Sequence, residues 1–363
     1  MITKEITQNV KNPISSRNDF IVIVLGCDQN YFSGLWVTLI SLSMSTTTKK
    51  KILFYIFDGD ISDNYKKKLE NQITKLLDDF SIHWLNYNSE SFKSFSSMDG
   101  SFVLYSRLLI PEVLSESKCI WLDVDLIVLK DIEELWNTDM GEFPLAACLD
   151  YRCTFSEDIS NHDEHNIPGN APYYNSGVML MELTSLKKTR FTTNTLRYLK
   201  EDFGSYKFHD QSAINVILYD KIKNLSSEWN YQTFFSLKSY QTEVKIFTEK
   251  NKILHFTQKP KLWQQYSGRI SSKVFYHLAQ ISNYNLNNLN SIENFKEKFK
   301  WKLPRVFLII YHLIFWFFPL KRKHRKIILN ELNSISRYKR DFSKHQMVGL
   351  LNRIEKRYYS KCK

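Results

Sequence analysis

Short apolar runs alternate with longer amphipathic stretches along the first 260 residues of the chain. The short runs are rich in β-branched and aromatic residues and end in turn residues, a pattern typical of buried strands. Because strand and helix patterns alternate, the sequence predicts an α/β fold with a mainly parallel sheet and helices on both faces. Strands are expected at residues 21–26, 51–57, 81–86, 119–122, 126–129, 144–149, 176–183 and 252–256, and helices at residues 36–44, 62–77, 102–114 and 210–219.

Local signals predict where these helices begin and end. Ser62 is expected to cap the second helix, and Pro111 to end the third. Asp210 stands where it would be the N-cap of the fourth. Residues 151–174 are rich in Asn, Asp, His, Pro and Gly and are expected to form a long polar loop. Loops of that length in compact domains are usually functional lids or disordered insertions.

Both ends of the chain differ from the part between them. Residues 1–18 are a polar lead-in without the apolar stretch of a secretory signal. Residues 306–318 are apolar except for His312, and as a helix they would span about 20 Å, short of a bilayer core of about 30 Å. Trp301 and Trp316 lie near Lys and Arg on either side, which is typical of a segment at a membrane interface. The alternative is a buried helix of a C-terminal subdomain.

Composition and charge narrow the class of protein. The chain has 363 residues, of which 43% are hydrophobic and 24% charged, so it is globular rather than disordered. The net charge is +12, and residues 301–363 hold 16 Lys or Arg against three Asp or Glu. The rest of the chain is therefore nearly neutral, which argues against a nucleic-acid partner and favours a neutral body with a cationic anchor. We expect a lead-in at 1–18, a main domain at 19–270 and a helical, basic, membrane-associated segment at 271–363.

The five cysteines form no CxxC pair, and their number is odd. We therefore expect free, buried thiols rather than a disulfide framework. This favours a reducing cytoplasmic location, on the inner face of the cell membrane if the basic segment is an anchor.

Candidate chemistry gathers where predicted strands end. Asp123 and Asp125 follow a buried strand, and where the chain turns they could converge on Mn²⁺ or Mg²⁺, although a solvated turn is the alternative. Asp28 and Asn30 follow the first strand and could bind a base and a ribose, while an Asx turn is the alternative. His255 ends the last strand of the body and is followed by lysines that could neutralise a diphosphate.

Seven motifs in one order resemble glycosyltransferase family 8. They are DQNY, LYSRLLIPE, WLDVDLIVLKDIEELW, ACLDY, YYNSGVMLMEL, HDQSAIN and HFTQKPKLW, and they cover about residues 19–265. Members of this family are retaining sugar-nucleotide transferases with a GT-A fold, and they include bacterial lipopolysaccharide galactosyl- and glucosyltransferases. The resemblance implies a UDP-galactose or UDP-glucose donor, Mn²⁺, and a glycan or lipid-linked glycan acceptor.

The resemblance also implies a role for individual residues. Asp123, Asp125 and His255 would hold the metal, and Lys261 would stabilise the leaving diphosphate. The remaining positions are Asp28, Asn30 and Tyr31 at the nucleotide, Arg107, Asn175, Asp210 and Gln211 around the donor hexose, and Asp150 near the donor sugar and the acceptor.

Three positions depart from the family pattern. Gln258 stands where many members have Gly, Leu262 stands before Trp263 where many have Pro, and Ser212 replaces an acidic residue. The spacing from His255 to Lys261 is kept, so the metal and phosphate roles remain expected.

Retention of the anomeric configuration suggests a front-face displacement. Gln211 is a poor nucleophile, so we expect the acceptor hydroxyl to attack from the side that UDP leaves, with Asp210 and Gln211 positioning the sugar.

Two other functions remain open on the sequence. One is a non-catalytic, nucleotide-binding membrane adaptor, against which the complete set Asp123, Asp125 and His255 argues. The other is a metal-dependent nucleotidyltransferase, which would usually carry a Gly-rich, basic phosphate loop after the first strand. The segment GCDQNY, which follows the first strand here, is neither rich in glycine nor basic.

Overall fold

The computed structural model describes residues 20–97, 100–233, 246–247, 250–257, 259–264, 270–286 and 344–362. The chain divides into two compact units: Met1–Thr233, Lys250–Thr257 and Lys361–Lys363 form the first, and Phe234–Glu249 and Gln258–Ser360 the second. The lead-in at 1–18 and the apolar run at 306–318 lie outside the described residues. The domain boundaries at 18 and 270 therefore stay predictions.

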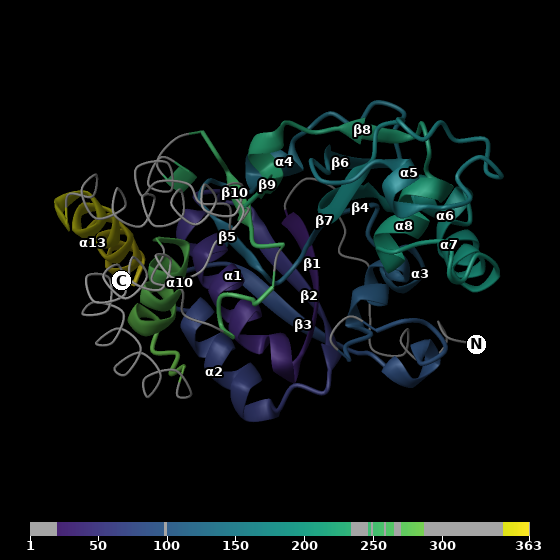
Figure 1. Cartoon of the computed structure of the whole chain (residues 1–363). Helices are drawn as coiled ribbons and strands as arrows, with labels where there is room; N and C mark the ends of the chain where they lie inside the picture. Colours follow the sequence, from purple (N-terminus) through teal and green to yellow (C-terminus); the bar gives the residue numbers. More distant parts are fainter. Residues whose placement is uncertain are drawn as a thin grey trace, which may run out of the picture. The chain divides into compact units, whose positions relative to one another are not determined.

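A seven-stranded sheet forms the centre of the first unit, in the order β3-β2-β1-β4-β7-β6-β8 (Figure 1). Strands β3, β2, β1 and β4 pair in parallel, as do β6 and β8, whereas β7 runs antiparallel to both β4 and β6. The mainly parallel α/β sheet is thus confirmed. The strands are β1 Phe20–Asp28, β2 Lys51–Gly59, β3 Phe80–Asn86, β4 Lys118–Leu122, β6 Leu145–Leu149, β7 Tyr174–Glu182 and β8 Ile222–Asn224.

A second, three-stranded sheet has the order β5-β10-β9. Strand β5 (Leu126–Val128) follows β4 after a short turn, and β10 (Ile253–His255) pairs antiparallel to it. Strand β9 (Tyr231–Gln232) pairs in parallel with β10 on the other side. All eight predicted strands occur, but those at 126–129 and 252–256 belong to this small sheet rather than to the main one.

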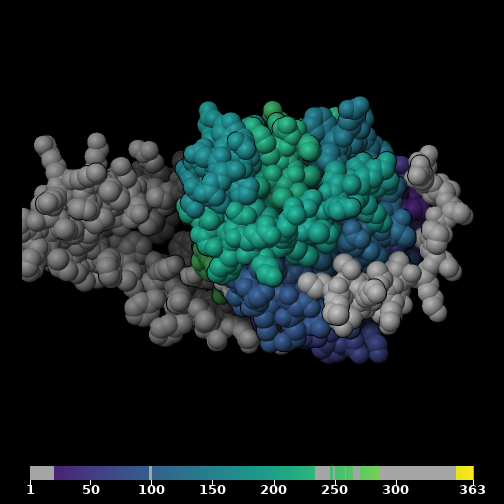
Figure 2. Space-filling view, turned by 90° about the vertical axis from the view of Figure 1, so that its right-hand side faces the viewer, coloured from purple at the N-terminus to yellow at the C-terminus, as the bar shows by residue number. Residues whose placement is uncertain are grey.

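Helices cover the sheets. Helix α1 packs against β5 and α2, while α6 and α8 pack against β7 (Figure 1). In Figure 2 the teal atoms of the segment around α5 to α8 form a continuous surface. The helices and 3₁₀ turns of the first unit are η2 Gln29–Tyr31, α1 Phe32–Ser45, α2 Asp63–Ile73, η3 Ser89–Phe92, η4 Val103–Leu108, α3 Ile110–Val113, α4 Glu133–Trp136, α5 Phe155–Asp158, α6 Leu183–Lys188, α7 Phe191–Glu201, α8 His209–Ile217 and η5 Ser227–Asn230.

The core of the first unit includes β1 and β2, two neighbouring inner strands of the main sheet. Residues 21–25 of β1 have no exposed surface, and residues 52–57 of β2 are buried as well. Burial on both faces explains why these strands are continuous apolar runs rather than alternating ones.

Three helix predictions need correction. The single helix predicted at 102–114 is a 3₁₀ turn followed by α3. Pro111 lies in the first turn of α3 instead of ending a helix. A proline is tolerated there because the N–H groups of a helix's first turn have no partner within the helix. Ser62 is at the N-cap of α2, but its side chain makes no capping hydrogen bond. Helix α8 begins at His209 with Phe208 as its N-cap, so Asp210 is not a capping residue.

The predicted polar loop at 151–174 contains one short helix, α5. Thr154 and Glu157 form a capping box at its start, in which the Glu157 carboxylate accepts the Thr154 N–H.

The second unit contains α10 (Ile270–Ile281) and α13 (Lys344–Lys361) among its described residues. Nε2 of His277 in α10 lies 4.0 Å from Oε2 of Glu355 in α13. No helix among the described residues is long and apolar enough to cross a membrane.

Candidate active site

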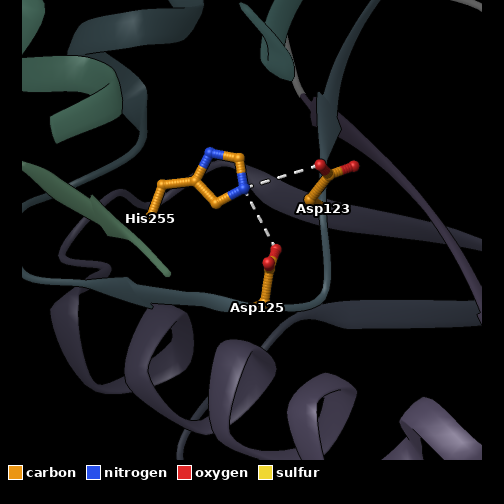
Figure 3. A group of neighbouring side chains, drawn as sticks. All are labelled: Asp123, Asp125 and His255. Carbon is orange, nitrogen blue, oxygen red and sulfur yellow. Dashed lines mark ion pairs between the residues drawn. The ribbon is translucent and has the colours of Figure 1, made fainter. Parts of the chain in front are cut away.

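Two carboxylates and one imidazole converge at the carboxyl ends of β4 and β10. Nε2 of His255 lies 3.2 Å from Oδ1 of Asp125 and 3.7 Å from Oδ2 of Asp123 (Figure 3). One ligand atom from each of the three side chains lies within 4.8 Å of the others. Two oxygens and one nitrogen in this arrangement suit a divalent cation such as Mn²⁺ or Mg²⁺.

The path of the backbone explains how three residues from two sheets meet. The N–H of Asp123 donates to the carbonyl of Gly177 in β7 at 2.8 Å, which keeps Asp123 on the main sheet. The carbonyl of Asp125 accepts the N–H of Phe256 at 3.0 Å, which ties it to the small sheet. Val124 is the single residue between them, so the turn from one sheet to the other brings both carboxylates to His255.

Three hydroxyl side chains of α1 hold that turn in place. Thr38 Oγ1 donates to the carbonyl of Val124 at 3.0 Å. Further along the helix, Ser41 Oγ accepts the N–H of Val128 at 3.0 Å, and Ser45 Oγ donates to the carbonyl of Val128 at 2.9 Å. All three are buried. Their spacing places them on one face of α1, which is why a helix with an otherwise apolar face carries hydroxyls there.

The two oxygens of Asp123 have different surroundings. Oδ1 accepts hydrogen bonds from Nη2 of Arg107 at 2.8 Å and from the indole N–H of Trp121 at 3.0 Å. Oδ2 is the oxygen on the side of His255. Donors that bind one oxygen fix the orientation of the carboxylate, so Oδ2 is held ready as a ligand.

Gly177 leaves room for the ligand side chains. A Cβ at this position would lie 2.2 Å from Cε1 of His255 and 2.9 Å from Oδ2 of Asp123. Real Cβ atoms essentially never come that close to another heavy atom. The absence of a side chain at residue 177 is therefore what allows His255 and Asp123 to face each other, and the donor set and this cradle together fit a metal ion.

Arg107 links the metal ligands to a second buried carboxylate. Its Nε lies 3.0 Å from Oδ2 of Asp210, and its Nη1 donates to the Ser176 carbonyl at 2.9 Å. Burial raises the pKa of Asp210 to about 6, an effect that Arg107 opposes and Asp123 reinforces. Two carboxylates, those of Asp123 and Asp210, thus share one guanidinium, and the resulting excess of negative charge favours the binding of a cation.

The residues that the family pattern places around the donor hexose form one hydrogen-bonded group. Oδ2 of Asp150 accepts from Nδ2 of Asn175 at 3.0 Å and from Nε2 of Gln211 at 3.3 Å. Oε1 of Gln211 accepts the N–H of Ser176 at 3.1 Å. Since Arg107 contacts Ser176 as well, the five predicted residues Arg107, Asp150, Asn175, Asp210 and Gln211 lie together beside the triad.

Of the predicted nucleotide residues, Asp28 is the last residue of β1, and Asn30 and Tyr31 lie in η2 directly after it. Strand β1 ends at the same edge of the main sheet as β4, because the two pair in parallel. Oδ1 of Asp28 accepts the N–H groups of Asn30 and Tyr31 at 2.9 and 3.1 Å, so this side chain forms the Asx turn that was the alternative interpretation. A role for these three residues in nucleotide binding stays a prediction.

Lys261 belongs to the second unit, so its phosphate-binding role stays a prediction. Its N–H donates to Oε1 of Gln264 at 2.9 Å. Of the departures from the family pattern, Gln258 lies outside the described residues. Ser212 is buried, and its Oγ accepts the N–H of Phe208 at the start of α8, a structural role that an acidic residue could also fill.

Sequence reasoning missed several residues that support the site. Oδ1 of Asn230 lies 2.9 Å from Nδ1 of His255, and Trp121 donates to Asp123. Thr38 would have been recognisable as the first of the regularly spaced hydroxyls in α1. Asn230 carried no such signal, because it lies at the end of a short 3₁₀ turn, far along the chain from Asp123.

Asp123, Asp125 and His255 lie together where β4 of the mainly parallel sheet and β10 of the small sheet end, an arrangement that could hold a metal ion in an enzyme site. The model of the family described as "Glycosyl transferase family 8" matches residues 22–267. The chain therefore belongs to glycosyltransferase family 8, and it is an enzyme of the hexosyltransferase class. This favours the transferase over the adaptor and the nucleotidyltransferase.

Similar proteins are known from bacteria. The chain is 28% identical to "General stress protein A" of Bacillus subtilis over 74% of this chain and 96% of that protein. It is 24% identical to "Lipopolysaccharide 1,2-glucosyltransferase" of Escherichia coli K12 over 77% of this chain and 84% of that protein. Among solved structures, galactosyltransferase LgtC in complex with donor and acceptor sugar analogs has a TM-score of 0.59 at 20% identity, covering 72% of this chain and 95% of that one. That likeness confirms the GT-A fold.

Proposed function

We propose that this enzyme transfers galactose or glucose from a UDP-sugar to a cell-surface glycan, with retention of the anomeric configuration and with Mn²⁺ as the metal. The observation that carries the proposal is the convergence of Asp123, Asp125 and His255 in a member of family 8. Bound by these side chains, Mn²⁺ would act as a Lewis acid for the negative charge that develops on the leaving diphosphate.

The protein's own side chains would fix the donor sugar. Both ends of the Gln211 amide are engaged, with Asp150 at the nitrogen and the Ser176 N–H at the oxygen. A side chain held in this way is suited to orienting a sugar hydroxyl, whereas an amide is a poor nucleophile. This supports front-face displacement, in which the acceptor hydroxyl attacks from the side that UDP leaves.

Asp150 is also better suited to positioning than to attack. Its two oxygens accept hydrogen bonds from the N–H of Arg152 and from the amides of Asn175 and Gln211. Hydrogen bonds to a carboxylate stabilise its charge and lower its nucleophilicity. We therefore assign Asp150 to the hydroxyl groups of the donor sugar or the acceptor.

A lipopolysaccharide-type or lipid-linked glycan is the proposed acceptor, at the cytoplasmic face of the cell membrane. The E. coli relative is named a lipopolysaccharide glucosyltransferase, and residues 301–363 of this chain hold 16 basic and three acidic side chains. Each basic residue near an anionic surface contributes about 1 kcal/mol to binding. Removal of residues 300–363 should move the protein from the membrane fraction to the soluble fraction, and a full-length chain that is soluble at low salt would contradict the anchor.

The transferase reaction is tested by the release of UDP. UDP-galactose, UDP-glucose and the UDP-N-acetylhexosamines are each incubated with the protein, with and without Mn²⁺, beside Asp125→Asn as the control. We expect Mn²⁺-dependent release from UDP-galactose or UDP-glucose that is lost in the variant. Equal release without Mn²⁺, or equal release by Asp125→Asn, would contradict the assigned metal site.

A further inference from the structure

His255 is connected to the sugar side of the site by a continuous chain of hydrogen bonds. Nδ1 of His255 lies 2.9 Å from Oδ1 of Asn230. Nδ2 of Asn230 donates to Oδ1 of Asn175 at 2.8 Å, and Nδ2 of Asn175 donates to Oδ2 of Asp150 at 3.0 Å. Asn175, Asn230 and His255 are nearly fully buried. In Figure 3 the second ring nitrogen of His255 points away from both carboxylates.

The direction of every hydrogen bond in the chain is fixed at its far end. An ionised carboxylate only accepts, so Asp150 requires the Nδ2 of Asn175. The N–H of Gly177 only donates, and it lies 3.0 Å from the other end of the same amide, so that end must be Oδ1. Asn230 must then present Nδ2 to Asn175 and Oδ1 to His255. The Asp150 carboxylate and the Gly177 N–H together determine the orientation of the Asn175 and Asn230 amides.

This fixed direction decides which nitrogen of His255 carries the proton. Oδ1 of Asn230 can only accept, so Nδ1 of His255 must be the protonated nitrogen. Nε2 then carries the lone pair, and Nε2 is the atom that faces Asp123 and Asp125. A metal ion binds the unprotonated nitrogen of a neutral imidazole. The hydrogen bonds that run from His255 through Asn230 and Asn175 to Asp150, the relay, therefore prepare the ring for coordination.

We propose that Asn230 is a positioning residue of the metal site, which, through Asn175 and Asp150, holds His255 in the Nδ1–H tautomer. The proposal deepens the proposed function and rests on its metal site. It also explains why a buried asparagine stands next to the small sheet. An apolar residue there would leave Nδ1 of His255 without this acceptor. The His255 ring could then carry its proton on Nε2, where the proton would block the metal.

The tautomer itself is measured first, on metal-free protein, at a pH at which the spectra show one proton on the ring. Long-range ¹H–¹⁵N correlation spectra report which ring nitrogen carries the proton, and His255→Gln identifies the signal among the nine histidines. We expect the Nδ1–H form for His255. An Nε2–H form in the wild-type protein would overturn the proposal, and this result requires no variant at residue 230 to fold.

The effect on metal binding is measured by the electron paramagnetic resonance signal of free Mn²⁺. Asn230→Leu removes the acceptor, and its affinity for Mn²⁺ is expected to fall at least about tenfold, the usual loss when a partner of a ligating histidine is removed. Asn230→Asp keeps an acceptor for the Nδ1–H but loses the donor to Oδ1 of Asn175, so its affinity should lie between those of Asn230→Leu and the wild type. Thr195→Val, which removes buried hydrogen bonds within α7, is the control for a general loss of stability.

The two proposals fail in different ways. Wild-type protein that binds no Mn²⁺ would contradict the metal site of the proposed function, while the tautomer measurement would still decide the relay. Wild-type protein that binds Mn²⁺, together with a folded Asn230→Leu variant of unchanged affinity, would overturn the relay alone.

Discussion

Gly177 is the position at which a single added methyl group perturbs the metal site most directly. In Gly177→Ala the new Cβ would lie 2.2 Å from Cε1 and 2.7 Å from Nδ1 of His255, where ordinary contacts are 3.4–4 Å. The ring or the strand must therefore move by roughly 1 Å. The strand does not move easily, because the Gly177 carbonyl accepts a hydrogen bond from the Asp123 N–H. The His255 ring does not move easily either, because it is hydrogen-bonded to Asn230.

The size of the effect follows from that displacement. Overpacking of a buried site usually costs about 1–3 kcal/mol of folding free energy. Metal sites tolerate deviations of only about 0.2 Å in ligand distance, so a shift several times larger should weaken Mn²⁺ binding by at least about tenfold. Stability and affinity should both fall, but the affinity should fall even under conditions in which the variant is fully folded.

Isothermal titration with Mn²⁺ and urea unfolding measure the two quantities. Gly169→Ala is the matched control, because its Cβ would lie 2.9 Å from Cβ of Ser156 and 3.1 Å from the His162 ring, away from the triad. It should lose stability and keep its affinity for Mn²⁺. A Gly177→Ala protein with wild-type affinity and wild-type stability would refute the packing argument.

Three further predictions concern charge and burial. Arg107→Met leaves Asp210 without its ion-pair partner and should lower the free energy of unfolding in urea by about 3–5 kcal/mol. The double variant that adds Asp210→Leu should recover much of this loss, and an unchanged urea midpoint in Arg107→Met would contradict the prediction. Burial raises the pKa of Asp210 to about 6, so the folded state holds this proton more tightly than the unfolded chain, and the group's stabilising contribution is lost as pH rises. From about pH 4 to 7, the free energy of unfolding of the wild type relative to Asp210→Asn should therefore fall by about 2 kcal/mol, and a flat difference would refute the assignment. Because the other four cysteines are buried, Cys362 should be the thiol that reacts quickly with Ellman's reagent in native protein, and Cys362→Ser should remove that fast phase.

The positions of the strands could be predicted from the sequence, but their directions could not. A strand buried on both faces is a continuous apolar run whether its neighbours are parallel or antiparallel to it. Residues 176–183 therefore gave no sign that β7 runs antiparallel to β4 and β6. The same reasoning explains why residues 126–129 were expected in the main sheet, since three-residue strands carry too little pattern to indicate their partners.

The candidate site was predicted where its residues carry their own signal. Asp123 and Asp125 could be found because they stand one residue apart at the end of a buried strand. Asp210 was given a capping role because only its neighbours along the chain could be considered, whereas its partner is Arg107, more than one hundred residues away. Asn230 was missed for the same reason, since its importance lies in contacts with Asn175 and His255.

The central claim is that Asp123, Asp125 and His255 hold a divalent metal at the diphosphate of a UDP-sugar. The most direct test is diffraction at the manganese absorption edge from crystals grown with Mn²⁺ and UDP. We expect one anomalous peak within coordination distance of these three side chains and in contact with both phosphates. Crystals that contain bound UDP but show the manganese peak elsewhere, or show none at this site, would contradict the account.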